Sequence, residues 1–157
     1  MIYMPMITEA YVAIYAAARL GAPHSVVFGG FAAKELASRI QDAKPSVIIT
    51  ASVGQEPGKL IDYAKLAKEA AEIAGVPELK KIIVNRKHLQ ESSVKADWVF
   101  DYEELMAKQT QGHDPVPVPS DHTLYILYTS GTTGTPKGII RSHAGTAVCL
   151  NYNIDLQ

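Results

Sequence analysis

Residues 123–138 read TLYILYTSGTTGTPKG, an apolar run followed directly by a loop of glycine, serine and threonine. Residues 123–128 are expected to form a strand, because β-branched and aromatic residues fit a pleated sheet. Residues 129–138 contain three glycines, one lysine and five hydroxyl side chains. Glycines let backbone N–H groups approach an anion closely, and a lysine adds positive charge. The loop is therefore expected to hold phosphate oxygens.

The loop has two competing interpretations. A Walker A loop ends in Gly-Lys followed by Ser or Thr, which holds magnesium. Here Pro136 precedes Lys137 and Gly138 follows it, and proline has no N–H to donate, so this interpretation is rejected. A mobile Ser/Thr/Gly linker is the simpler alternative. It is disfavoured because the stretch is short, follows a strongly apolar run and ends in Pro-Lys-Gly before more β-rich sequence.

The rest of the chain alternates short apolar runs with helical patterns. Gly21 and Gly75 follow two of the helical patterns, at the position typical of a helix C-cap. Such alternation predicts right-handed βαβ units. The expected fold class is α/β, with a mostly parallel sheet and helices on both faces. Strands are expected at residues 1–4, 25–28, 46–50, 82–84, 123–128 and 139–141, and helices at residues 7–20, 32–43, 60–74, 102–108 and 144–152.

The composition argues against several kinds of partner and site. The 157 residues carry 15 Lys and Arg against 16 Asp and Glu, so no overall basic field exists for a nucleic acid or an anionic membrane. Charges and prolines interrupt every apolar run before the roughly 18 residues of a membrane span. The single cysteine, Cys149, excludes an internal disulfide, and the histidines show no metal-ligand spacing. A reducing compartment and no metal site are expected.

The segment from Tyr128 to Gly138 resembles the signature loop of the adenylate-forming, or AMP-binding, enzymes. This superfamily includes acyl-CoA synthetases, luciferases and the adenylation domains of peptide synthetases. Residues 2–6 and 24–31, with Arg39-Ile40, resemble the short-chain acetyl-CoA and propionyl-CoA synthetases. Residues 56–59 and 139–141 are more similar to the propionyl-CoA synthetases. The resemblance spans essentially the whole chain.

The resemblance implies an ATP-dependent short-chain acyl-CoA ligase acting on propionate or acetate. Members convert a carboxylate and ATP into an acyl-adenylate and pyrophosphate, and the thiol of coenzyme A (CoA) then displaces AMP. Lys137 is implied as the catalytic residue that offsets charge as pyrophosphate departs, the alternative being a solvated loop charge. The residues implied around the ATP phosphates are Thr129, Ser130, Gly131, Thr132, Thr133, Gly134 and Lys137.

Two other segments are implied as the CoA site. A pair of glycines would let the pantetheine arm approach closely, and a lysine would contact a nucleotide phosphate. Acetyl-CoA synthetases often have arginines where Glu56 and Lys59 stand, so a contact from Glu56 would involve its backbone or the CoA ribose. The alternative is a plain turn after a strand and an exposed helix N-terminus. The implied residues are Phe28, Gly29, Gly30, Glu56, Pro57, Gly58 and Lys59.

Residues 1–157 are expected to be part of the AMP-binding N-terminal domain, without the C-terminal domain, and to be inactive alone. The helical pattern of residues 7–20 is apolar nearly all round, which predicts that further protein covers it. Magnesium is implied, with its ligands outside this chain, and the partners are small molecules. The compartment implied is the cytoplasm or the mitochondrial matrix. Two alternatives stay open: a non-catalytic nucleotide-binding or interaction module of the same fold, and an amino-acid adenylation domain, which residues 28–31 disfavour.

Overall fold

The computed structural model describes residues 1–110, 112–129 and 136–155, and a parallel sheet lies at its centre. The sheet has four strands in the order β1-β2-β5-β6, and every neighbouring pair is parallel. Each link from one strand to its parallel neighbour passes through one or more helices or a long loop, as parallel pairing requires. The strands are β1 (Ile2–Tyr3), β2 (Val47–Ala51), β5 (Lys80–Val84) and β6 (Val99–Asp101).

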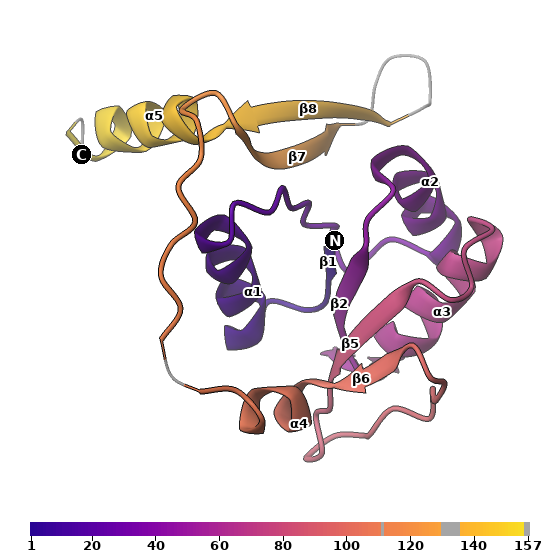
Figure 1. Cartoon of the computed structure of the whole chain (residues 1–157). Coiled ribbons are helices and arrows are strands. Elements are labelled where there is room, and N and C mark those ends of the chain that lie inside the picture. Colours follow the sequence, from indigo (N-terminus) through magenta and orange to yellow (C-terminus); the bar gives the residue numbers. More distant parts are fainter. Residues whose placement is uncertain (111, 130–135, 156–157) are drawn as a thin grey trace.

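Helices cover both faces of this sheet, as predicted (Figure 1). On one face, α2 (Ala33–Ala43) and α3 (Tyr63–Ile73) pack over Tyr3 and Ile48, with Leu36 and Ala67 among the buried contacts. On the other face, α1 (Thr8–Arg19) packs over Ile2 and Ala51, and α4 (Tyr102–Ala107) adds Tyr102. Successive strand residues point to opposite faces, so Ile2 and Tyr3 belong to different cores.

The helix ends follow from local sequence. The Asp62 carboxylate accepts a hydrogen bond from Lys65 N at 2.8 Å and caps the start of α3. Asp101 caps α4 in the same way through Glu104 N at 2.9 Å. Helix α2 ends at Ala43 and is followed by Lys44, whose φ of 45° is left-handed, and then by Pro45. None of the described helices is both long and apolar enough to cross a membrane.

Two parts of the sheet differ from the sequence prediction. Residues 25–28 form no strand: Val26 makes only an isolated bridge to Ile2, although the segment lies along β1. The strand predicted at residues 123–128 is β7 (Thr123–Thr129), which pairs antiparallel with β8 (Lys137–Ser142) outside the parallel sheet. Periodicity identifies a strand but does not identify its neighbour.

The helix predicted at residues 60–74 is also partly wrong. Residues 59–61 form β4 (Lys59–Ile61), which pairs antiparallel with β3 (Gly54–Glu56), and α3 begins only after Asp62. The two-residue link between these strands is Pro57-Gly58, and Gly58 has a φ of +77°. Proline followed by a glycine with positive φ is typical of a type II turn.

The C-terminal part of the chain lies along one side of the molecule and consists of β7, β8 and α5 (His143–Asp155) (Figure 1). Its backbone joins the rest at His24, whose N–H donates to Leu124 O at 3.2 Å and whose carbonyl accepts from Ile126 N at 2.8 Å. On α1, Tyr11 is 52% and Tyr15 is 68% exposed, and the coverage of this helix by further protein stays a prediction.

Candidate functional site

The two ends of the predicted phosphate loop lie side by side. Thr129 is the last residue of β7 and Lys137 is the first of β8, and the two are directly paired across the hairpin. Both side chains are exposed. Paired residues of an antiparallel ladder have Cβ atoms about 5 Å apart, so the Lys137 stem begins next to Thr129. The remaining phosphate-loop residues, Ser130, Gly131, Thr132, Thr133 and Gly134, lie outside the described residues.

The strand that leads into this loop is tied to helix α2 through Tyr128. The Tyr128 hydroxyl donates a hydrogen bond to the Asp42 carboxylate at 2.5 Å. The guanidinium of buried Arg39 lies 5.6 Å from the Tyr128 ring centroid and 4.3 Å from that of Phe31. Burial, and then the Asp42 hydrogen bond and charge, raise the pKa of Tyr128. Arg39 therefore sits between the predicted CoA segment and the base of the phosphate loop.

The first predicted CoA segment packs against Tyr63, the first residue of α3. A Cβ on Gly29 would overlap the Tyr63 hydroxyl, and a Cβ on Gly54 would overlap the edge of the same ring. Only glycine fits at these two positions without a shift of the ring. Phe28 is 73% exposed beside this turn, and its ring meets the Phe31 ring edge-on at 5.8 Å.

The second predicted CoA segment is the tip of the β3–β4 hairpin. Glu56 and Lys59 are paired residues, and their side chains form an ion pair with 3.3 Å between nitrogen and oxygen. Gly54 begins this hairpin, and Tyr63 contacts both Gly54 and Gly29. Tyr63 thus links the first predicted CoA segment to the base of the hairpin whose tip is the second. The phosphate loop and these segments are linked more indirectly, through Phe31, Arg39 and Tyr128.

A pocket of about 530 Å³ opens beside the hairpin tip. Residues 5–7, residues 55–58 and Arg86 line it. These residues follow the carboxyl ends of β1, β2 and β5 respectively. In open α/β sheets, ligands bind outside the carboxyl ends of the parallel strands, so this pocket lies at the edge where a site is expected.

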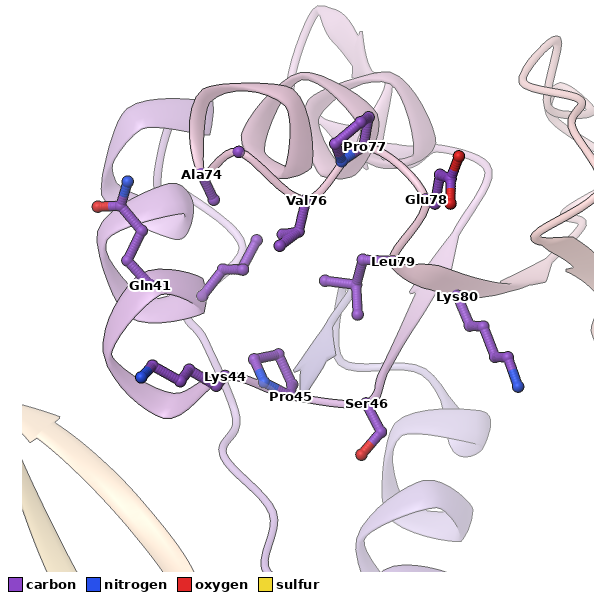
Figure 2. A pocket seen from close by; sticks show the side chains of 12 residues that line it. Gln41, Lys44, Pro45, Ser46, Ala74, Val76, Pro77, Glu78, Leu79 and Lys80 are labelled. Carbon is purple, nitrogen blue, oxygen red and sulfur yellow. The ribbon is translucent and has the colours of Figure 1, made fainter.

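Another pocket, of about 750 Å³, lies at the opposite edge of the sheet and contains none of the predicted site residues. Figure 2 shows Pro45 and Ser46 on one side of it, and Val76, Pro77 and Leu79 facing them. These residues precede β2 and β5, so the pocket lies at the amino ends of the strands. Its position between the two helix-to-strand loops gives it no link to the candidate site.

The family described as "AMP-binding enzyme" matches residues 1–156. The chain belongs to the AMP-binding enzymes. The predicted family is therefore confirmed, and so is the predicted α/β fold class.

Several AMP-binding enzymes are similar to this chain over almost all of it. The mitochondrial acyl-CoA synthetase short-chain family member 3 of Bos taurus is 50% identical over 153 residues, which cover 98% of this chain and 22% of the relative. The propionate–CoA ligase of Escherichia coli is 43% identical, with coverage of 99% and 25%. The acetoacetyl-CoA synthetase of Streptomyces lividans superposes with a TM-score of 0.78 at 32% identity, covering 94% of this chain and 22% of that one. The chain thus spans about a fifth to a quarter of the length of these relatives.

Sequence reasoning missed several residues that shape this candidate site. Tyr63 lay inside a predicted helix and carried no sign of its contacts with two glycines. Arg86 lay between the expected strand at residues 82–84 and the expected helix at residues 102–108, where no element was expected. Asp42 has a carboxylate on the last turn of α2, and only the fold brings it to Tyr128. One signal was available for Arg39, a charged residue beside Ile40 on the apolar side of a helical pattern.

Proposed function

We propose that this chain is part of an ATP-dependent short-chain acyl-CoA ligase that activates propionate or acetate. The observation that carries this proposal is the similarity of nearly the whole chain to short-chain acyl-CoA synthetases and a propionate–CoA ligase, at 43% to 50% identity. Identity at this level makes the same class of chemistry the simplest expectation. The acid–thiol ligase reaction consumes a carboxylate, ATP and CoA and yields acyl-CoA, AMP and pyrophosphate.

The chemistry has two steps, and the proposed residues act in different ones. In the first, the carboxylate oxygen attacks the α-phosphorus of ATP and pyrophosphate leaves, forming an acyl-adenylate. Residues 129–134 would hold the β- and γ-phosphates through backbone N–H groups and hydroxyls, and Lys137 would offset the charge of the departing pyrophosphate. In the second step, the CoA sulfur attacks the acyl carbon and AMP leaves.

The geometry supports this division of roles. The hairpin β7–β8 brings Lys137 beside Thr129, so the lysine and the start of the phosphate loop would face the same anion. Tyr63 packs against Gly29 of the first CoA segment and against Gly54, at the base of the hairpin that carries residues 56–59. Arg39 contacts Phe31, next to the first CoA segment, and Tyr128, at the base of the phosphate loop, so it lies between the two proposed substrate regions. Their relative position matters because the two half-reactions share the acyl-adenylate.

The chain is proposed to be one portion of the AMP-binding N-terminal domain and to be inactive alone. Its similarity covers only 22% to 25% of the relatives. Magnesium would accompany ATP, with protein ligands supplied by other parts of the enzyme. One relative's name assigns it to mitochondria and another relative is bacterial, so we propose a mitochondrial matrix or bacterial cytoplasmic enzyme.

Pyrophosphate release from the complete protein that contains this chain tests the proposal. Propionate or acetate should support pyrophosphate release that depends on ATP and magnesium. Free CoA should be consumed and acyl-CoA should accumulate. The Lys137→Ala variant should be at least about ten-fold slower in the adenylation step, as expected when one charge-stabilising group is removed. Turnover with only long-chain or aromatic acids would refute the substrate class. Turnover with amino acids and a carrier-protein arm in place of CoA would identify an amino-acid adenylation domain.

A further inference from the structure

The pocket beside the β3–β4 hairpin has an uneven charge distribution. Among the described residues that line it, Arg86 is the one basic side chain and Glu56 is the one acidic side chain. Lys59, the cation of the hairpin itself, forms an ion pair with Glu56 at 3.3 Å. The hairpin tip therefore has no net charge. A polyanionic ligand bound there requires a cation from another element.

Arg86 is held in a turn that fixes where its side chain starts. Its backbone N–H donates to Ser52 Oγ at 3.0 Å, and the Ser52 hydroxyl donates in turn to Gln90 O at 2.7 Å. The Arg86 carbonyl accepts from the N–H groups of Leu89 and Gln90, at 2.8 and 3.0 Å. Ser52 is fully buried, so these bonds connect the turn to the core. The base of the Arg86 side chain is thus preorganised at the carboxyl end of β5.

The guanidinium group of Arg86 is oriented by one hydrogen bond and has further N–H donors. Arg86 Nη1 donates to Val53 O at 3.3 Å, next to the start of β3. A guanidinium has five N–H donors in a planar fork that matches the spacing of phosphate oxygens. The bond to Val53 commits one of them. Because Arg86 lines the same pocket as residues 55–58, its other donors are available to a ligand that contacts the hairpin tip.

We propose that Arg86 binds a phosphate of the nucleotide portion of CoA, which lies in the pocket between residues 5–7 and the hairpin tip. This inference rests on the proposed function, which assigns residues 56–59 to CoA. It adds the residue that supplies the positive charge, and it assigns Glu56 and Lys59 a lesser electrostatic role. Neighbouring Lys87 takes no part, because its Nζ lies 2.7 Å from the Glu103 carboxylate and the side chain does not line this pocket.

The test is a calorimetric titration with CoA of the complete protein that contains this chain, comparing Arg86→Gln with Lys87→Gln. Both substitutions remove one positive charge from adjacent positions, so Lys87→Gln controls for general electrostatics. Arg86→Gln should weaken CoA binding by about ten-fold or more, because a charge-assisted hydrogen bond is lost. Lys87→Gln should change it by less than about two-fold, as expected for an exposed charge away from the ligand. Unfolding midpoints verify that each variant is folded.

Further variants and ligands separate the possible outcomes. Arg86→Lys should recover part of the affinity, and Glu56→Gln should raise it, because a carboxylate beside the anion is removed. Pantetheine, which has no phosphate, should bind wild type and Arg86→Gln equally. If dephospho-CoA loses the Arg86 effect, the contact is to the 3′-phosphate; if it keeps the effect, the contact is to the diphosphate.

Two results would overturn the inference. Equal losses of CoA affinity in Arg86→Gln and Lys87→Gln would mean that only general charge attraction acts on CoA. The proposed function would then stand without a role for Arg86. No binding of CoA to the complete wild-type protein would remove both this inference and the CoA assignment of residues 56–59. In that case pyrophosphate release from the complete protein still tests the adenylation half of the proposed function separately.

Discussion

The parallel-sheet region, residues 1–110, and the hairpin–helix region, residues 123–129 and 136–155, differ in how they are buried. Among the described residues, every buried side chain lies between Ile2 and Val84. In the hairpin–helix region, Val148 is 69% exposed and Ile140 66%. The sheet region contains its own hydrophobic core, whereas the hairpin–helix region depends on a few contacts to it. The predicted phosphate loop thus sits on the less stabilised part of the chain.

A matched pair of leucines should show the largest difference between the two regions. Leu36 in α2 is 0% exposed, and Leu150 in α5 is 58% exposed. Leu36→Ala should lower the free energy of unfolding by about 2–5 kcal/mol, because it leaves a cavity in the core. Leu150→Ala should change it by about 0.5 kcal/mol or less, since little apolar surface is lost from contact. Urea denaturation of both variants measures this, and equal losses would contradict the division into two regions.

The tight packing of Tyr63 gives the next largest expected effect. Gly29→Ala places a methyl group against the Tyr63 hydroxyl and should cost about 1–3 kcal/mol of stability through overpacking. In a Tyr63→Phe background the hydroxyl is absent, so the same substitution should cost less. A double-mutant cycle of unfolding free energies measures this coupling. Additive effects would mean that the turn at Gly29 moves away from the ring at little cost.

Most helices and strands of both regions were predicted from sequence, including β7, β8 and α5 of the hairpin–helix region, expected at residues 123–128, 139–141 and 144–152. The helices at residues 8–19 and 33–43 and the strands at residues 47–51 and 80–84 all have regular apolar patterns, and each was predicted within a few residues. The strand β6 was missed because its three residues, Val99–Asp101, are too few to show a pattern. The β3–β4 hairpin was missed because Leu60 and Ile61 extend the helical apolar pattern that begins at Tyr63.

The candidate site was predicted only where its residues are adjacent in sequence. The phosphate loop and the two CoA segments are short motifs with distinctive composition. Other residues were missed because they contact partners that are distant in the sequence, namely Tyr63, Arg39, Asp42 and Arg86. Asp42, for instance, is separated from its partner Tyr128 by 86 positions. The antiparallel pairing of β7 with β8 was missed for a similar reason, since a strand pattern carries no information about strand order.

The hydrogen bond between Tyr128 and Asp42 joins the two regions, and its loss should have a moderate effect. Tyr128→Phe keeps the ring against Arg39 but removes the donor to the Asp42 carboxylate. The free energy of unfolding at neutral pH should fall by about 1 kcal/mol, the usual net value of one such bond. Hydrogen exchange of β7 amides should quicken while that of β2 amides does not. Equal changes in both strands would mean that the regions unfold as one unit.

The same bond predicts a pH dependence. Burial and the Asp42 carboxylate raise the pKa of Tyr128 above its ordinary value of 10.0. The folded state therefore holds this proton more tightly than the unfolded state, and the contribution is fully present below pH 10. Above that pH the unfolded tyrosine ionises first, so the advantage of wild type over Tyr128→Phe should shrink as pH rises. Unfolding measured from pH 8 to 11.5 tests the sign, and a widening advantage would contradict it.

The smallest effect on the free energy of unfolding is expected at the tip of the β3–β4 hairpin, which is exposed to solvent although it belongs to the sheet region. The Lys59 and Glu56 side chains are 65% and 44% exposed, so water screens their ion pair. Lys59→Gln should lower stability by about 0.5 kcal/mol or less, comparable to Lys68→Gln, which breaks the exposed Lys68–Glu72 pair on α3. The turn at Pro57-Gly58 fixes the hairpin by its backbone conformation, which neither substitution alters. A loss above about 1 kcal/mol in Lys59→Gln alone would mean that the ion pair rather than the turn holds the hairpin. Substitutions at the tip could then no longer be interpreted as effects on ligand binding alone.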